Sequence, residues 1–393
     1  MRRLILAVGL TAALATGLTA AVTAQAEIQD GRRLIAQADF KGAEQRFRSA
    51  LRKSADDRTN FAAFANLGAV LYYEYSYERA EQAYRKALAI QPRLSPVYQL
   101  EAASVLNNLA VLYSRTGRLE EAERTSIEAV RTRRRYEPSE SPALAGLLVT
   151  LASIYHDRGK YDEAELEAAR AISILDHAEP TIQRKFLPSA LRQLAVTKLA
   201  RRVDLHEAGR LLDRARLVQE KLPSADFAEL AIVYSNLGAL RILEERYEDA
   251  ALDLQQALET WKRTNLKTRE AAAAMNNLAQ VYKLTGRPAD AEPLYRSAIS
   301  ICAEALGKSH PTCALFSGNL ADLLLSKGQG TTALAMSERA LQILAANYPP
   351  QHPDVIRLRD QVARIQSAKE ASWSVALRDL SRRKVADPAS FKH

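Results

Sequence analysis

One stretch decides the fold of this chain. Residues 107–130 read NNLAVLYSRTGRLEEAERTSIEAV, with apolar residues three and four positions apart on both sides of Gly117. This spacing predicts two amphipathic helices joined by a tight turn. The smallest residues, Ala110 and Ala122, stand where a core would normally hold bulk. The stretch therefore predicts a helical hairpin whose two helices approach each other closely.

The same pattern recurs along the chain. One alanine follows each turn, and a leucine about thirteen residues earlier precedes it. The alanines, spaced by 37 to 44 residues, are Ala43, Ala80, Ala122, Ala164, Ala208, Ala250, Ala291 and Ala333. The leucines, spaced by 41 to 43 residues, are Leu67, Leu109, Leu151, Leu194, Leu237, Leu278 and Leu320. Two markers with one period predict a stacked array of about eight helical hairpins.

Small residues keep the same register. A Gly or Ala follows every leucine of the series: Gly68, Ala110, Ala152, Ala195, Gly238, Ala279 and Ala321. A larger side chain there would overpack the hairpin, at about 1 to 3 kcal/mol per site. A glycine also stands where the first helix of a pair needs a left-handed residue to end: Gly117, Gly159, Gly286 and Gly328. Tyr75, Val203 and Glu245 replace that glycine elsewhere, and we expect those turns to be built differently.

A known family has this pattern. Residues 276–311 read NNLAQVYKLTGRPADAEPLYRSAISICAEALGKSHP. This segment resembles the tetratricopeptide repeat, and its 42-residue period resembles the kinesin light chain type. The resemblance covers residues 31–350 and implies an all-α, right-handed superhelical solenoid of antiparallel helix pairs. It also implies binding to other proteins, without saying which, because such arrays serve many partners.

The N-terminus differs from the repeats. Residues 1–26 begin with Arg2 and Arg3, continue through an apolar run from Leu4 to Val22 and end at Ala24-Gln25-Ala26. This is typical of a bacterial-type secretory signal peptide, and an uncleaved membrane anchor is the alternative. We expect cleavage, a periplasmic or secreted protein, and no stable membrane insertion of the mature chain.

The rest of the chain divides by pattern. We expect the repeat array over residues 27–353, and a C-terminal capping helix or degenerate ninth repeat over residues 354–381. Residues 382–393 would form a basic tail. A terminal helix must be apolar inside and polar outside. Its expected inner face is Val355, Leu358, Val362 and Ile365.

Chemistry-bearing motifs are absent from the sequence. It contains no phosphate-binding loop, HExxH, CxxC or nucleophile elbow, and its six histidines do not pair at ligand spacing. We therefore expect no enzyme, no cofactor and no metal site. The formal net charge of +9 is spread out, and its basic runs lack interleaved aromatic residues, so nucleic acid is not expected as a partner.

Three features leave alternatives open. Cys302 and Cys313 form either a disulfide or two buried thiols. The tyrosines of YYEYSY, residues 72–77, form either an exposed contact patch or partly core. Two basic runs form either a solvated face or a docking site for an acidic partner. These runs are Arg131, Arg133, Arg134 and Arg135, then Arg201, Arg202, Arg210, Arg214 and Arg216.

Amide side chains supply the candidate binding site. The residue before each leucine is Asn66, Asn108, Thr150, Gln193, Asn236, Asn277 or Asn319. The family resemblance implies that this position lines the concave surface. An amide offers donors and an acceptor, so it can bind the backbone of an extended peptide. The alternative is that each amide fixes the packing between repeats.

Neighbouring residues extend this set. Asn107 and Asn276 form doublets with Asn108 and Asn277, and Tyr73, Arg115 and Lys283 follow about one turn later. We expect an exported scaffold that binds an extended segment of a cell-envelope protein in an Asn-lined groove. Its oligomeric state stays open. The alternative function is an accessory factor for assembly of an envelope or polymer-export complex, docking through its convex or basic faces.

Overall fold

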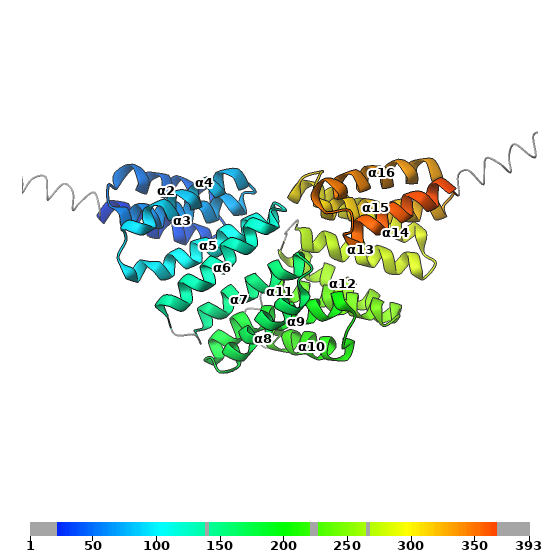
Figure 1. The fold of residues 1–393 in the computed structure, drawn as a ribbon, viewed down its shortest axis with the longest axis horizontal. Coiled ribbons are helices and arrows are strands. Elements are labelled where there is room, and N and C mark those ends of the chain that lie inside the picture. Colours follow the sequence, from blue (N-terminus) through cyan, green and yellow to red (C-terminus); the bar gives the residue numbers. More distant parts are fainter. Residues whose placement is uncertain (1–21, 138–140, 221–226, 265–267, 368–393) are drawn as a thin grey trace, which may run out of the picture. The chain divides into compact units, whose positions relative to one another are not determined.

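A computed structural model of the protein describes residues 22–137, 141–220, 227–264 and 268–367. Every regular element among these residues is a helix, and successive helices pair antiparallel across tight turns (Figure 1), so the predicted all-α repeat array is confirmed. Two compact units, Met1–Val218 and Gln219–His393, are described separately below. No helix in the described ranges is long and apolar enough to cross a membrane.

The first unit contains five helix pairs. A helix over residues 22–36 pairs with α2 (Phe40–Lys53), and 3-10 turns at Gln91–Arg93 and Pro96–Tyr98 precede α5. The other pairs are α3 (Asp57–Tyr73) with α4 (Tyr77–Ile90), α5 (Gln99–Arg115) with α6 (Leu119–Tyr136), α7 (Pro142–Asp157) with α8 (Tyr161–Asp176), and α9 (Pro180–Arg201) with α10 (Leu205–Glu220).

The second unit continues the pattern with three pairs and a final helix over residues 353–367. The pairs are α11 (Phe227–Leu243) with α12 (Tyr247–Thr264), α13 (Arg269–Leu284) with α14 (Pro288–Leu306), and α15 (Pro311–Ser326) with α16 (Gly330–Asn347).

Small residues let the two helices of a pair nest. A Cβ added to Gly68 would lie 2.6 Å from the ring of Tyr84, and one added to Gly238 would lie 2.5 Å from Leu254. Such distances leave no room for a side chain. The five alanines at the same position are fully buried: Ala110, Ala152, Ala195, Ala279 and Ala321.

The first repeat keeps this register although no leucine marks it. A Cβ on Gly31 would lie 2.6 Å from the ring of Phe47, the same sixteen-residue relation as between Gly68 and Tyr84. Ala24 and Ile28 of helix 22–36 are fully buried. The predicted cleavage site, Ala24-Gln25-Ala26, therefore lies inside the first turns of this helix. Residues 1–21 of the predicted signal peptide lie outside the described residues.

The turns without glycine correct one prediction. Tyr75 and Glu245 adopt a left-handed φ of 59°, as the glycines do at 74° to 79°. The hydrogen-bond pattern is also the same: Ser76 N donates to Leu71 O at 2.9 Å, as Arg118 N donates to Tyr113 O at 2.8 Å. Our prediction of a different turn was wrong at these two sites. The turn between α9 and α10 does depart, because there Arg202 and Asp204 are left-handed and Val203 is not.

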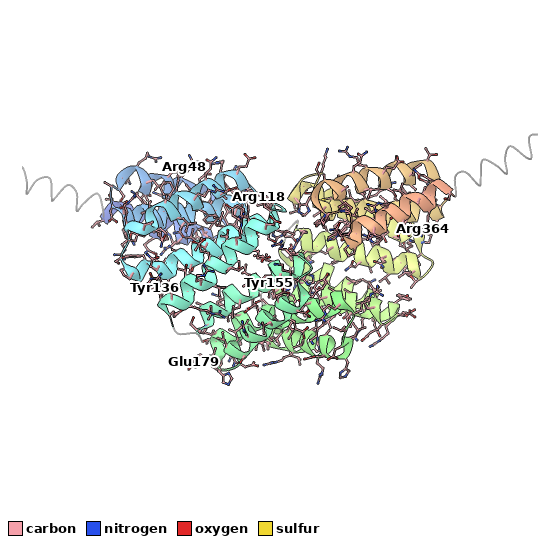
Figure 2. The ribbon with its side chains drawn as sticks, in the orientation of Figure 1. Arg48, Arg118, Tyr136, Tyr155, Glu179 and Arg364 are labelled. Carbon is pink, nitrogen blue, oxygen red and sulfur yellow. A yellow bond between two sulfur atoms is a disulfide. The ribbon has the colours of Figure 1, made fainter. Side chains whose placement is uncertain are left out.

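Ion pairs join consecutive repeats. In five repeats a glutamate follows the marker alanine, and each contacts a cation of the next repeat. Arg118, labelled in Figure 2, lies 2.6 Å from Glu81. The other pairs are Glu44 with Arg79, Glu123 with Arg158, Glu165 with Lys198, and Glu292 with Lys327. Partly exposed pairs of this kind contribute about 0 to 1 kcal/mol each, so they tune register more than stability.

The final helix, residues 353–367, covers the last repeat. Its apolar face buries Val355, Leu358, Val362 and Ile365. Gly318 admits Leu358, since a Cβ there would lie 2.7 Å from that side chain. The Gln361 amide donates to Gly318 O at 2.7 Å. The helix over residues 353–367 therefore has the apolar inner face expected of a capping helix, and its role as a cap stays a prediction.

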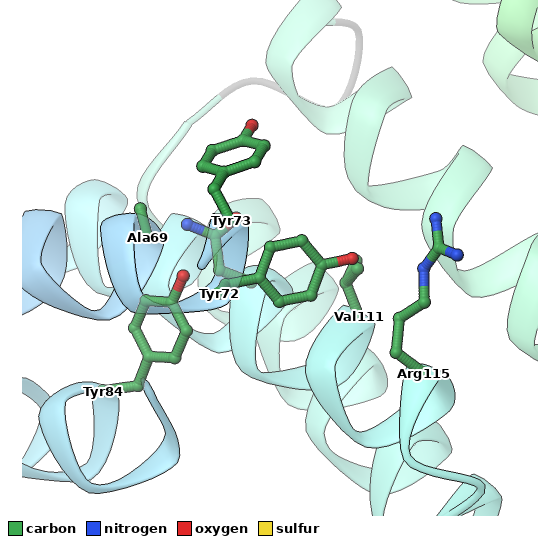
Figure 3. Close-up of a pocket in the computed structure, with 7 residues that line it drawn as sticks. Ala69, Tyr72, Tyr73, Tyr84, Val111 and Arg115 are labelled. Carbon is green, nitrogen blue, oxygen red and sulfur yellow. The ribbon is translucent and has the colours of Figure 1, made fainter. Parts of the chain in front are cut away.

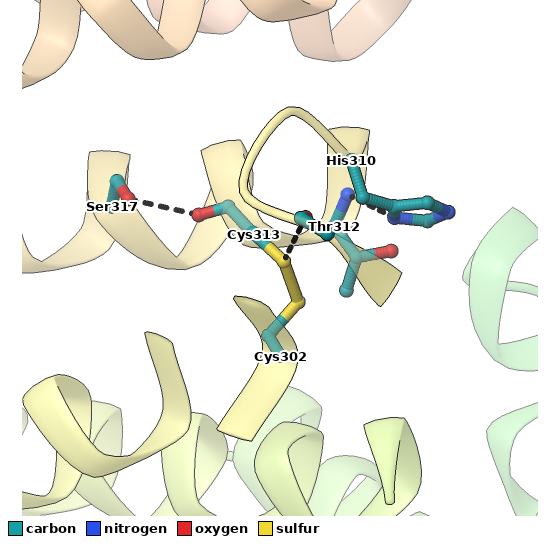
Figure 4. The surroundings of a disulfide bond; sticks show 6 residues. Cys302, His310, Thr312, Cys313 and Ser317 are labelled. Atoms are coloured by element: carbon teal, nitrogen blue, oxygen red, sulfur yellow. Dashed lines mark hydrogen bonds between the residues drawn. A yellow bond between two sulfur atoms is a disulfide. The ribbon is translucent and has the colours of Figure 1, made fainter. Parts of the chain in front are cut away.

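A disulfide joins two repeats. Cys302 of α14 and Cys313 of α15 are bonded, with an S–S distance of 2.12 Å and a Cα–Cα distance of 5.6 Å (Figure 4). Both residues are buried. Of the two alternatives raised by the sequence, the structure therefore contains the disulfide.

Candidate functional site

A pocket of about 360 Å³ opens between α3 and α5 in the first unit. Tyr73, Asn108 and Arg115, three residues singled out from the sequence, line it. The remaining lining residues are Ala69, Tyr72, Tyr84 and Val111. Figure 3 shows the rings of Tyr72 and Tyr84 on one side and the side chain of Arg115 on the other. The structure therefore brings part of the predicted site together around an aromatic pocket.

The tyrosines of YYEYSY form the pocket wall and the surface beside it. Tyr73 is 55% exposed, and its ring stacks on Phe40 at 5.3 Å between centroids. The ring centroid of Tyr72 lies 5.8 Å from that of Tyr73 and 5.7 Å from that of Tyr77. Tyr75 is also exposed. Two of these tyrosines are exposed and two are half-buried, so the cluster is mainly a surface feature.

Tyr84 supplies the buried side of the pocket. Its ring lies against Gly68, which leaves the side chain 2% exposed. Burial raises the pKa of the Tyr84 phenol well above its ordinary value, and a side-chain hydrogen bond with Asn108 opposes this. The phenol therefore keeps its proton. Asn108 itself is exposed on α5, which leaves its amide accessible from the pocket.

Other predicted amides lie in the interface between repeats. Asn276 is only 5% exposed, and its Oδ1 accepts a hydrogen bond from Asn319 Nδ2 of the next repeat at 2.9 Å. Its Nδ2 donates to Asn277 Oδ1 at 3.3 Å. At Asn276 and Asn319, the structure shows the alternative in which the amides fix the packing between repeats. We therefore leave Asn276 and Asn319 out of the candidate site.

Asn107 occupies the position in its repeat that Asn276 occupies in its own. Thr150 stands where Asn319 would provide the donor, but the Thr150 hydroxyl donates to Gly146 O of its own helix at 3.3 Å. Asn107 Oδ1 is buried and finds no hydrogen-bond partner among the described residues. The side-chain hydrogen bond between consecutive repeats, which we call the rung, is thus formed at Asn276 and is missing at Asn107.

The remaining predicted residues do not join the pocket. Asn66 Nδ2 donates to Ala62 O of its own helix at 2.7 Å. Lys283 forms an ion pair with Asp322 of the next repeat. Asn236 and Asn277 are half-buried on α11 and α13 of the second unit. Their binding role stays a prediction.

Four of the nine arginines in the basic runs have ion pairs with carboxylates. Arg133 is paired with Glu137, Arg201 lies 2.8 Å from Asp162, and Arg214 is paired with Asp176. The fourth is Arg216, which lies 3.3 Å from Asp213. Paired guanidinium groups present little free positive charge to an acidic partner. Within the described residues, no three His, Cys, Asp or Glu side chains gather as metal ligands.

The sequence analysis missed two kinds of lining residue. Ala69 and Val111 lie one turn from predicted residues, so helical spacing would have found them, and Tyr72 belongs to the YYEYSY cluster already named from the sequence. Tyr84 lies on α4, the second helix of its pair. Its signal is the large residue sixteen positions after Gly68, which reaches the pocket because the glycine leaves space.

These features define a helical repeat array with an aromatic pocket on the first helices of adjacent repeats. Models of the tetratricopeptide repeat match residues 62–94, 101–176 and 271–312. The matched segments are tetratricopeptide repeats. The fold of the chain is that of a protein–protein interaction scaffold, and members of this family are typically not enzymes. A comparison with curated proteins gives no significant match.

Solved structures share the fold at low sequence identity. A Rap protein complexed with Competence and Sporulation Factor is 13% identical, with a TM-score of 0.57 over 88% of this chain and 98% of that one. The apo quorum sensor NprR of B. thuringiensis is 13% identical, with a TM-score of 0.52 over 87% and 98%. A putative kinesin light chain of Podospora anserina is 20% identical, with a TM-score of 0.41 over 53% and 97%.

Proposed function

We propose that this protein is an exported scaffold that binds an extended peptide segment of a cell-envelope protein. The observation that carries the proposal is the pocket between α3 and α5, where Tyr73, Asn108 and Arg115 converge. Amide and guanidinium groups there can bond a peptide backbone while tyrosine rings hold a side chain. In the second unit, Asn236 and Asn277 would offer amide groups of the same kind to a peptide.

Two observations support export. The N-terminal sequence is typical of a signal peptide. The Cys302–Cys313 disulfide is of the kind that persists outside a reducing cytosol. Export would place the partner in the envelope or beyond it.

Two of the solved structures with this fold carry names that concern signalling. One of them was solved in complex with Competence and Sporulation Factor, and another is a quorum sensor. The alternative function, docking through basic faces, receives less support because four of the nine arginines in the basic runs are paired with carboxylates.

Selection from a displayed library of random peptides tests the proposal. The bait is the full chain, and selected peptides are measured against the wild type and against the triple variant Asn108→Ala, Asn236→Ala, Asn277→Ala. We expect the triple variant to lose about tenfold or more in affinity. Its helicity and unfolding midpoint should stay near those of the wild type.

The matched control is Asn347→Ala, because Asn347 lies at the end of a second helix and its amide donates to Ile343 O. This change should leave affinity unchanged. A library that yields no specific peptide would contradict the proposal. So would a triple variant that binds normally, or one whose unfolding midpoint falls together with its affinity.

A further inference from the structure

The pocket in the first unit has a composition that peptide-backbone recognition alone does not require. Three of its seven lining residues are tyrosines. Phe40, Tyr75 and Tyr77 extend the aromatic surface through ring contacts with Tyr72 and Tyr73 or with one another. Tyr73 and Tyr75, which are two positions apart in the sequence, are each more than half exposed. Exposed aromatic rings that cluster in this way form a candidate contact surface.

The rings are held in place before any ligand binds. Tyr73 stacks on Phe40 at an interplanar angle of 15°, and Tyr72 meets Tyr73 edge-on at 79°. Tyr84 is fixed by its contact with Gly68. Rigid rings offer a large contact area at a small cost in conformational entropy. The surface is therefore suited to a ligand that is itself stiff.

Every polar side chain of the pocket can donate a hydrogen bond, and the phenols and the amide can also accept one. The polar groups are the three phenol hydroxyls, the Asn108 amide and the Arg115 guanidinium, and no carboxylate stands among the lining residues. The Tyr84 phenol stays protonated because burial raises its pKa. A ligand rich in acceptors can therefore be bound there.

We propose that this pocket binds a proline-rich segment in the polyproline II conformation. Proline rings stack on aromatic side chains, and a polyproline II backbone points free carbonyl groups outward, because it has no internal hydrogen bonds. Proline also has no N–H group, so such a segment brings acceptors and few donors. The segment is stiff before it binds, which matches the fixed rings. This inference rests on the proposed peptide-binding function and names the class of peptide.

Direct binding of three synthetic peptides to the full chain tests it. The first has about twelve residues with proline at every third position and leucine or serine between, which spans the pocket at about 3.1 Å per residue. The second has every proline replaced by alanine. The third is an acidic peptide without proline. We expect the first to bind at least about tenfold more tightly than the other two.

Variants of Tyr73 show where the peptide binds. Tyr73→Ala removes an exposed ring and should weaken binding of the proline-rich peptide about tenfold, whereas Tyr73→Phe keeps the ring and should retain most of the affinity. The control is Tyr136→Ala, which removes another exposed tyrosine of the same unit (labelled in Figure 2) and should have no effect. Circular dichroism confirms that each variant keeps its helices.

The outcomes separate this inference from the proposed function. Equal binding of the alanine peptide, tighter binding of the acidic peptide, or normal binding by Tyr73→Ala would overturn the proline assignment. If library peptides still require Asn108 and contain no excess of proline, the scaffold function stands and the ligand class is wrong. If no peptide of any class binds, both fail.

Discussion

The side-chain amide of Asn319 donates to Asn276 Oδ1 across 2.9 Å and forms a polar rung between two consecutive repeats. The equivalent position in an earlier repeat, Asn107, has the acceptor without the donor. A buried acceptor without a partner lowers the free energy of unfolding by about 1 to 3 kcal/mol. We therefore expect substitutions at the two positions to change stability in opposite directions.

Thr150→Asn should restore the missing rung. The new amide stands where Asn319 stands in its repeat and can donate to Asn107 Oδ1, so we expect a gain of about 1 kcal/mol in the free energy of unfolding. Denaturant titration of the full chain measures it. Thr150→Ala serves as the control for loss of the threonine side chain, and Asn319→Ala should destabilise. An unchanged midpoint for Thr150→Asn would mean that the helices do not approach closely enough there.

Gly68→Ala and Gly146→Ala should change stability in opposite directions. Both glycines lie inside the first helix of a pair, where alanine is favoured by about 1 kcal/mol. At Gly146 an added Cβ meets nothing within 4 Å, so that gain should appear in full. At Gly68 the Cβ would meet the Tyr84 ring at 2.6 Å, and overpacking costs about 1 to 3 kcal/mol. Thermal unfolding of the two variants should give midpoints on opposite sides of the wild type.

Removing the disulfide should destabilise the second unit. A link that closes a loop of eleven residues contributes about 3 kcal/mol by restricting the unfolded chain. Urea unfolding of Cys302→Ala, Cys313→Ala should therefore show a lower midpoint, and reductant should shift the wild type but not the variant. A wild type that is insensitive to reductant after unfolding in its presence would argue against this contribution.

Acid should destabilise the fold through His156. Burial lowers the pKa of this imidazole below its ordinary value, although the Asp157 charge opposes the shift. The unfolded chain then binds a proton near pH 6.5 while the folded chain does not, so stability present above that pH is lost as the pH falls towards the folded pKa. Unfolding midpoints at pH 7.5 and 5.5 should differ less in His156→Phe than in the wild type.

The exposed His206 supplies the control for that measurement. His206→Gln should keep the pH dependence of the wild type. A His156→Phe variant with an unchanged dependence would assign the acid sensitivity to other groups.

The repeat architecture could be predicted because a leucine followed by a small residue, such as Leu109 with Ala110, recurs at a nearly constant spacing. The first helix, residues 22–36, was divided between two predicted segments because the apolar run before it is typical of a signal peptide and no leucine precedes Gly31. The turns at Tyr75 and Glu245 were misjudged for a different reason. The capping hydrogen bonds impose a left-handed residue there whether or not a glycine is present.

The candidate site was only partly accessible to sequence reasoning. Tyr73, Asn108 and Arg115 share one pocket because helical spacing places them there, and that spacing could be counted. The sequence could not show that Asn108 is exposed and Asn276 is buried. One step along a helix turns a side chain by about 100°, so the two members of a doublet face different directions. Which amide of a doublet faces solvent is decided by how neighbouring helices cross, and this depends on the whole set of packed side chains.

The bond between Cys302 and Cys313 stitches one hairpin to its neighbour, because it connects α14 to α15 rather than the two helices of a pair. An array in which each repeat contacts only its neighbours can lose order from a free end, one hairpin after another. If unfolding starts at the helix over residues 353–367 and then includes α16 and α15, the next contact to be lost is the one that the disulfide between α14 and α15 holds. The disulfide keeps the unfolded hairpin close to α14, so that the hairpin can refold against α14 before the next repeat unfolds.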